Sequence, residues 1–193
     1  MSYHHGNLKD ALVMAAENLL EHSGGARALS LRQTAEQAGV SHNAPYRHFR
    51  DKAALLDEVL QKTLIDLAEK TLQAQLIYPA SPLMQLQHVG RLVMQMAWRS
   101  PQRAHLLLGY QATKPDSALA AAFELFRQNI RELLTTVTGS GEAESLALQL
   151  IALWRGLAGM HTSGLHSALV DGEEPLYEFS DFATENLLKS FMR

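Results

Sequence analysis

Apolar residues recur every three or four positions along almost the whole chain, and no stretch alternates apolar and polar residues as a strand would. Near the N-terminus, Leu8, Leu12, Ala15 and Leu19 fall at i, i+4, i+7 and i+11. This spacing places them on one face of an amphipathic helix. The pattern predicts an all-α protein of about nine helices, without an internal repeat.

Caps, glycines and prolines indicate where these helices begin and end. The first helix should start near Asn7 and stop at the glycines of "SGGAR", while Ser30 and Asp51 are typical N-cap residues. Pro79 and Pro82 interrupt the helical pattern. We therefore expect helices near residues 7–22, 30–38, 41–48, 52–76, 83–100, 101–111, 117–137, 142–165 and 176–192.

The breaks divide the chain into three parts. Residues 1–50 form a small three-helix head, residues 51–78 a connecting helix, and residues 79–193 a larger helical bundle. We assign regulation and dimerisation to the bundle.

The head contains a tight turn between two short helices. Leu31, Ala35, Ala38, Val40 and Phe49 are spaced as the small core that holds the pair together, and Gly39 gives the turn its backbone freedom. This is the pattern of a helix-turn-helix. Residues 41–48 then form a recognition helix whose polar side chains contact base edges and phosphates in a DNA major groove.

Composition restricts the class of protein. There is no cysteine, which excludes disulfides and thiolate metal sites. No secretory signal is present, and no apolar run approaches the roughly 20 residues needed to span a bilayer, so we expect a cytoplasmic protein that does not contact membranes. The net charge is −3, so attraction to DNA must come from the local placement of cations.

Two segments of the chain resemble the DNA-binding domain of the TetR family of bacterial transcriptional regulators. Their sequences are "ALVMAAENLLEHSGG" and "LSLRQTAEQAGVSHNAPYRHFRDKAALL". The resemblance covers residues 8–58 and implies a homodimeric repressor that binds a palindromic double-stranded operator. It implies phosphate contacts by Tyr46, His48 and Lys52. The DNA-binding residues expected from motif and resemblance are Ser30, Arg32, Ser41, His42, Asn43, Ala44, Tyr46, Arg47, His48 and Lys52.

The bundle resembles the family less. TetR-like regulators usually dimerise through their last two helices, and the helix at 142–165 carries an apolar ridge that fits such a seam, formed by Leu146, Leu150, Leu153, Trp154 and Leu157. The alternative is an internal core helix, because periodicity reports burial and not the partner. Trp154 and Gly159 also resemble a subgroup with a tryptophan-histidine-glycine signature, although Ala158 replaces the histidine.

The resemblance implies a pocket in the bundle for a small apolar or amphipathic effector. Such a pocket has apolar walls with a few polar groups, and the candidates are Met94, Trp98, His105, Tyr110, Phe123, Phe126, Met160 and His161. For each of them, plain core packing is the alternative. His161 and His166 are five residues apart, which does not favour a metal pair on one helix face. No cofactor is expected.

Three functions remain open at this point. The first is a ligand-responsive homodimeric repressor, and the second is a DNA-binding dimer without a small-molecule effector, constitutive or controlled by a protein partner. The third is a helical enzyme, which we do not expect, because the sequence has no glycine-rich phosphate loop, nucleophile elbow or paired carboxylates. A cavity above about 300 Å³ would favour the first function over the second.

Overall fold

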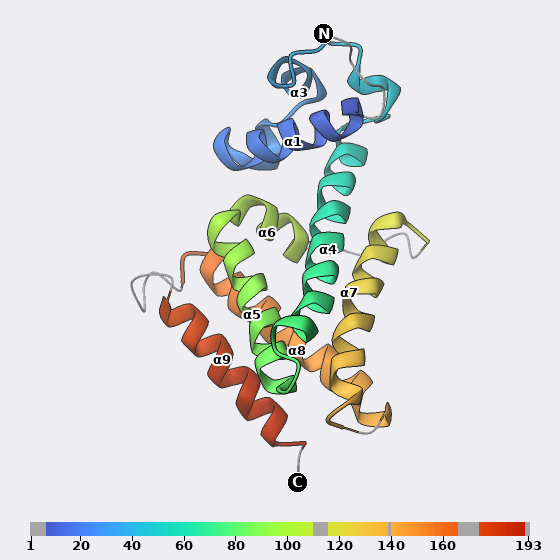
Figure 1. Cartoon of the computed structure of the whole chain (residues 1–193). Helices are drawn as coiled ribbons and strands as arrows, with labels where there is room; N and C mark the ends of the chain where they lie inside the picture. The colour runs from blue at the N-terminus through green and yellow to red at the C-terminus, as the bar shows by residue number, and fades with distance from the viewer. Residues whose placement is uncertain (1–6, 110–115, 139, 166–173, 192–193) are drawn as a thin grey trace. The chain divides into compact units, whose positions relative to one another are not determined.

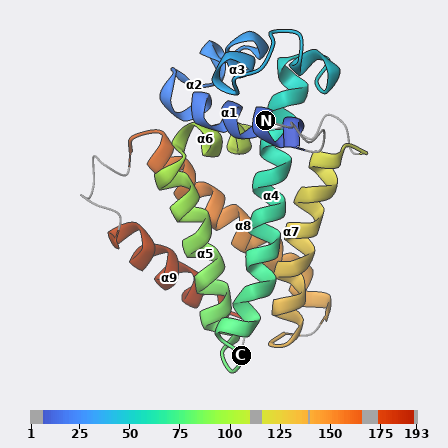
Figure 2. The ribbon, with the colours of Figure 1, turned by 45° about the horizontal axis from the view of Figure 1, so that its top comes forward.

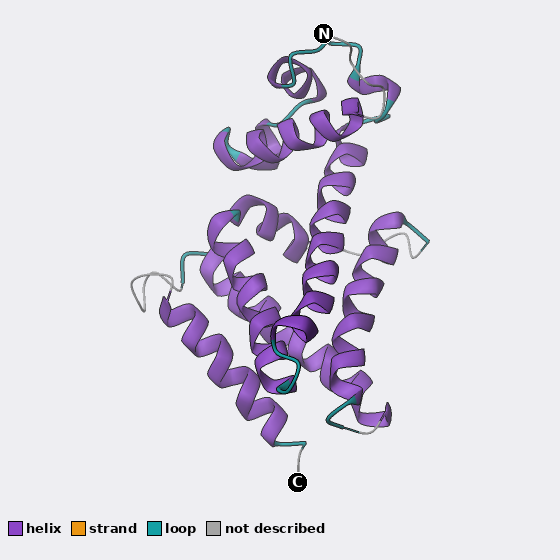
Figure 3. Ribbon diagram, viewed as in Figure 1, coloured by secondary structure: helices purple, strands orange, loops and turns teal. Residues whose placement is uncertain are grey.

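The computed structural model describes residues 7–109, 116–138, 140–165 and 174–191, and within these ranges the chain is helical, without strands (Figures 1 and 3). The all-α prediction is confirmed. The described elements are α1 (Asn7–His22), α2 (Gly25–Ala28), α3 (Leu31–Gln37), the 3₁₀ helix η1 (Pro45–Arg47), α4 (Lys52–Ile77), α5 (Pro82–Arg99), α6 (Pro101–Gly109), α7 (Ala118–Thr135), α8 (Ser140–Thr162) and α9 (Glu174–Lys189).

Most helix starts carry the caps that the sequence indicates. Ser30 Oγ accepts a hydrogen bond from Gln33 N at 3.2 Å, and Asp51 Oδ1 accepts one from Ala54 N at 2.8 Å. Ser81 and Ser117 cap α5 and α7 in the same way. Side-chain oxygens at these positions satisfy backbone N–H groups that have no partner within the helix.

The chain divides into two compact units, Met1–Lys62 and Thr63–Arg193, and the division falls inside α4. The sequence pattern predicts a head that ends earlier, at residue 50. The first turns of α4 belong with the head because Leu55 and Val59 are fully buried and Glu58 pairs with Lys9 of α1. Burial of these side chains explains why the compact unit extends past the cap at Asp51.

The N-terminal unit has a small continuous core. Leu12, Ala16 and Leu20 of α1 are fully buried, as is Ala35 of α3, and Phe49 is almost so. Helix α1 packs against α2 and α3, and α3 packs against η1. The core therefore fixes the position of the turn that follows α3.

The C-terminal unit is a bundle in which α5 packs against α9, α8, α6 and α7. Figures 1 and 2 show α9 running alongside α5 while α8 crosses behind it. Asn129 of α7 donates a buried hydrogen bond of 2.9 Å to the carbonyl of Ala68 in α4. The apolar stretches of the described helices are too short or too often interrupted by charge to cross a bilayer.

Ion pairs join α5 to α9 and α7 to α8 within the C-terminal unit. Arg91 of α5 donates from Nε to Asp181 Oδ2 of α9 at 2.8 Å, and this hydrogen bond raises the pKa of Arg91. Arg127 of α7 pairs with Glu124 on its own helix and Glu144 on α8. The hydrogen bond from Arg127 lowers the pKa of Glu124, so the carboxylate form is favoured by folding.

Candidate functional site

The turn after α3 depends on a left-handed glycine. Gly39 has φ 68°, a conformation that is costly for residues with a side chain. Gly39 N donates to Glu36 O, and Val40 N donates to Ala35 O, both at 3.0 Å. These bonds satisfy carbonyls at the end of α3 and redirect the chain toward η1.

Residues 41–48, the recognition segment, are not the α-helix that the sequence predicted. They form a turn followed by the one-turn helix η1. Pro45 has no N–H to donate to Ser41 O, and this carbonyl accepts instead from Ala44 N at 2.9 Å. The missing donor explains why regular α-helical bonding does not run through the segment.

The polar side chains of the recognition segment lie on the surface of the N-terminal unit. Tyr46 is 59% exposed, and the other exposed members are Ser41, His42, Asn43, Arg47 and His48. Ala44 differs from the expectation, because its side chain is 9% exposed and packs inward. Burial of Ala44 and Pro45 anchors the segment and leaves the polar groups available.

The expected DNA-binding residues outside the recognition segment are Ser30, Arg32 and Lys52. Arg32 on α3 is exposed, whereas the Ser30 hydroxyl is engaged as the α3 cap and also donates to Gln33 Oε1 at 2.7 Å. Lys52 Nζ donates to Ala26 O of α2 at 3.1 Å. Lys52 therefore has a structural partner in the head, which its spacing in the sequence did not reveal.

The apolar ridge of α8 is part of the core of the C-terminal unit. Leu146, Leu150, Trp154 and Leu157 are buried within the single chain, where α8 packs against α5, α6, α7 and α9. The expected dimer seam is therefore wrong for these four residues. Helical periodicity reports a buried face but does not distinguish a neighbouring helix from a second copy.

A different face of α8 and α9 is apolar and exposed. Phe179 is 55% and Phe182 63% exposed on α9. They border a shallow groove whose other lining residues are Gln149, Ala152, Leu153, Ala183, Asn186, Leu187 and Ser190. Of the expected seam only Leu153 lies here. The sequence pattern did not single out the two phenylalanines as interface residues. They lie outside the buried stripe of α9, which includes Leu176, Ser180, Thr184 and Leu188.

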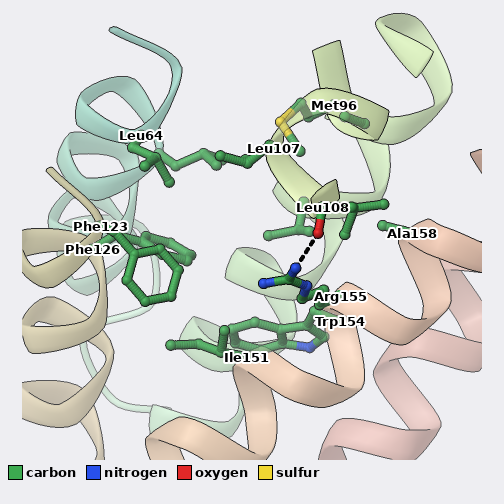
Figure 4. A pocket seen from close by; sticks show the side chains of 13 residues that line it. Leu64, Met96, Leu107, Leu108, Phe123, Phe126, Ile151, Trp154, Arg155 and Ala158 are labelled. Atoms are coloured by element: carbon green, nitrogen blue, oxygen red, sulfur yellow. Dashed lines mark hydrogen bonds between the residues drawn. The ribbon is translucent and has the colours of Figure 1, made fainter. Parts of the chain in front are cut away.

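An apolar cavity of about 60 Å³ lies among α4, α5, α6, α7 and α8 (Figure 4). Of the expected pocket residues, Phe123 and Phe126 line it, and Trp154, expected in the seam, lines it too. Twelve of its thirteen lining residues are apolar and the thirteenth is Arg155. In Figure 4 the guanidinium of Arg155 is bonded to the carbonyl of Leu108.

The other expected pocket residues are placed elsewhere. Met94 is fully buried in the core and does not line the cavity, and His105 is exposed. Trp98 and His161 stack on each other with ring centroids 4.7 Å apart, and neither they nor Met160 line the cavity. Tyr110 lies outside the described residues. Periodicity marked these residues as apolar or aromatic but did not show which helix each one faces.

Comparison with known proteins agrees with this arrangement. Residues 12–59 match the family model described as "Bacterial regulatory proteins, tetR family". A nucleoid occlusion factor SlmA from Edwardsiella ictaluri is 26% identical over 165 residues, which cover 78% of this chain and 81% of that protein.

Solved structures extend the similarity to the whole fold. A protein of unknown function from Rhodococcus sp. RHA1 is 25% identical, with a TM-score of 0.80 and complete coverage of both chains. A TetR-family transcriptional regulator from Streptomyces coelicolor is 19% identical, with a TM-score of 0.71 and 97% coverage of each chain. Residues 12–59 therefore match the TetR-family model, and the chain shares its helical fold with these solved structures.

Proposed function

We propose that the protein is a homodimeric, sequence-specific transcriptional regulator that represses genes by binding a palindromic operator in the cytoplasm. The observation that carries this proposal is the exposed recognition segment. It presents two histidines, Asn43, Tyr46 and Arg47 on a core-anchored turn. Asn and Arg can read base edges by paired hydrogen bonds, and Tyr46 can reach a phosphate.

The exposed apolar face of α8 and α9 supports the dimer. Phe179 and Phe182 of α9, beside Leu153 of α8, form an exposed apolar patch, and such a patch is costly in water unless a partner covers it. A twofold axis through Phe179 and Phe182 would pair each face with its copy, because a twofold interface uses the same patch on both subunits. Two recognition segments would then lie in successive major grooves, about 34–36 Å apart.

We further propose that a small ligand regulates DNA binding. The cavity in the C-terminal unit has contributions from α4 to α8, and α4 continues into the head. A ligand that bound more tightly to a conformation incompetent for DNA would shift the population away from the operator.

The size of the cavity favours a second candidate, a DNA-binding dimer without a small-molecule effector. The volume of about 60 Å³ is well below the roughly 300 Å³ of a typical ligand pocket. The similarity to nucleoid occlusion factors is a further reason to consider DNA binding that is constitutive or controlled by a protein partner.

Selection of bound duplexes from a random pool tests the shared part of both candidates. We expect the full-length protein to enrich a palindrome with half-sites about one helical turn apart. Enrichment of a single half-site would contradict the dimer, and no enrichment above the non-specific background would contradict sequence-specific binding. The selected operator then serves as the probe for effects of ligands.

A further inference from the structure

The hydroxyl of Ser30, at the start of α3, uses its hydrogen-bonding capacity inside the chain. Ser30 Oγ accepts a hydrogen bond from Gln33 N at 3.2 Å and donates one to Gln33 Oε1 at 2.7 Å. A serine hydroxyl has one hydrogen to donate, and the phosphate oxygens of DNA only accept. Ser30 therefore cannot bond to a phosphate without giving up its bond to Gln33.

Ser30 is also fixed through its backbone. Its carbonyl accepts hydrogen bonds from Thr34 N at 3.0 Å and from Thr34 Oγ1 at 2.9 Å. The two neighbours of Ser30 in the chain, Leu29 and Leu31, are 2% and 6% exposed. Both sides of Ser30 are thus anchored in the core of the N-terminal unit, and this anchoring fixes the first turn of α3.

The side chain of Gln33 is exposed, and the cap orients its amide group. Because Oε1 accepts the proton of Ser30, the two N–H donors of Nε2 remain, and no residue in the described part of the chain accepts from them. Serine followed three residues later by glutamate or glutamine is the pattern of a capping box. Glutamine keeps this position neutral and adds donors, whereas glutamate would place a negative charge there.

We propose that Gln33 contacts the phosphate backbone of the operator through Nε2, and that Ser30 is the residue that positions it. In a helix-turn-helix the first helix of the pair crosses the DNA backbone while the second element enters the groove, and α3 is that first helix. Glutamine side chains are among the groups that donate to phosphate oxygens. The inference rests on the proposed operator binding, and it assigns to Gln33 the contact that the sequence pattern predicts for Ser30.

The charges along α3 support this orientation. The first turn of α3 contains no acidic residue, and both Arg32 beside Gln33 and Arg27 of α2 are exposed. The acidic residue of α3 is Glu36, which is exposed next to Gln37 near the end of the helix. Phosphates are therefore attracted to the start of α3 and repelled from its end. Gln37, exposed on the same helix, is the matched control for Gln33.

Adding a positive charge at each glutamine tests the proposal in the full-length protein. Fluorescence anisotropy at several salt concentrations would compare wild type, Gln33→Lys and Gln37→Lys on the selected operator and on a scrambled duplex. We expect Gln33→Lys to bind both duplexes more tightly and to steepen the slope of log affinity against log salt by about 0.9. Gln37→Lys should keep a slope close to that of wild type. A gain of affinity cannot come from a variant that fails to fold.

Removing the donors of Gln33 gives the complementary result. Gln33→Met keeps the length of the side chain and a good helix former. It should weaken binding to both duplexes about tenfold, the scale of one hydrogen bond to a charged group. The salt slope should stay unchanged, because a neutral donor releases no counterion. Gln37→Met should bind as wild type does.

The role of Ser30 is tested through its coupling to Gln33. Ser30→Thr keeps the hydroxyl and should restore wild-type affinity, whereas Ser30→Ala should lower both the melting temperature and the affinity for DNA. The double variant Ser30→Ala, Gln33→Met should lose no more affinity than Gln33→Met alone, because Ser30 acts on DNA through Gln33. Additive losses would show that Ser30 contacts DNA itself and would overturn its positioning role.

Equal effects at positions 33 and 37, or wild-type affinity in both Gln33 variants, would overturn the phosphate contact. Wild type is titrated in the same experiment, so its binding to the operator separates the two levels of the argument. If wild type binds the operator and the Gln33 variants behave like the Gln37 variants, this inference fails and the proposed function stands. If wild type does not distinguish the operator from the scrambled duplex, the proposed function fails.

Discussion

The indole Nε1 of Trp154 on α8 donates a hydrogen bond to Thr184 Oγ1 on α9, 3.0 Å away and shielded from solvent. Trp154 is 1% exposed and Thr184 is fully buried. Gly90 of α5 lies against the same indole, since a Cβ at this position would come within 2.6 Å of Nε1. One tryptophan therefore joins three helices of the C-terminal unit.

Thr184→Val should destabilise the protein, because it removes the acceptor of a buried N–H and keeps the side-chain shape. An unsatisfied buried donor costs about 1–3 kcal/mol. Urea denaturation measures the loss, with Thr135→Val at an exposed position of α7 as the control. Equal midpoints for the two variants would mean that the hydrogen bond contributes little.

Gly90→Ala should also destabilise, although alanine is the better helix former by about 1 kcal/mol. The added methyl would meet Trp154 Nε1 at 2.6 Å and Ser180 Oγ at 2.9 Å, and overpacking of this kind costs about 1–3 kcal/mol. Gly141→Ala is the matched control, because a Cβ there meets nothing within 4 Å. Thermal unfolding should place Gly90→Ala below wild type and Gly141→Ala at or above it.

Phe182→Glu should convert the proposed dimer to a monomer while leaving the fold of each chain intact. Phe182 is 63% exposed in the single chain, so the substitution costs little within the protomer, whereas a buried carboxylate in a twofold interface is strongly unfavourable. Light scattering after size exclusion gives the mass. Leu125→Glu, at a position on α7 that is 43% exposed, should not change it.

Arg47→Ala and Lys52→Ala should weaken DNA binding in different ways. If Arg47 reads a base, its loss costs about 1–3 kcal/mol on the selected operator and little on random DNA. If Lys52 contacts a phosphate, its loss weakens binding to all sequences and reduces the salt slope by about one. Because Lys52 also donates to Ala26 O, Lys52→Ala should lower the melting temperature as well. Wild-type affinity in both variants would contradict the proposed docking.

His88 should make the protein less stable in mild acid. Burial, and secondarily the charge of Arg91, lower the pKa of His88 from its ordinary value of 6.5. The unfolded chain therefore takes up a proton at a higher pH than the folded chain, so the free energy of unfolding falls as pH drops from about 6.5 toward the lowered pKa of His88. His88→Gln should lose less stability than wild type between pH 7 and 5. An equal loss in both proteins would exclude His88 as the cause.

Caps and breaks could be placed from local chemistry alone. The sequence correctly indicated Ser30 and Asp51 as caps, the interruption at Pro79 and Pro82, and a buried face on α8. It did not reveal that Lys52 pairs with the carbonyl of Ala26, because the two residues are 26 positions apart. It also predicted a recognition helix at residues 41–48 that Pro45 shortens, and the structure has a turn and the single 3₁₀ turn η1 there.

The sequence by itself determined the helical class, the glycine turn after α3 and the polar character of the recognition segment. These depend on periodicity, backbone freedom and hydrogen-bonding groups that each residue carries locally. Only the tertiary structure decided that Leu146 and Leu150 belong to the core, that Phe179 and Phe182 remain exposed, and that Arg155 lies beside the cavity. A repeat of apolar residues specifies that a helix face is buried, but the partner of that face is set by the packing of the whole unit.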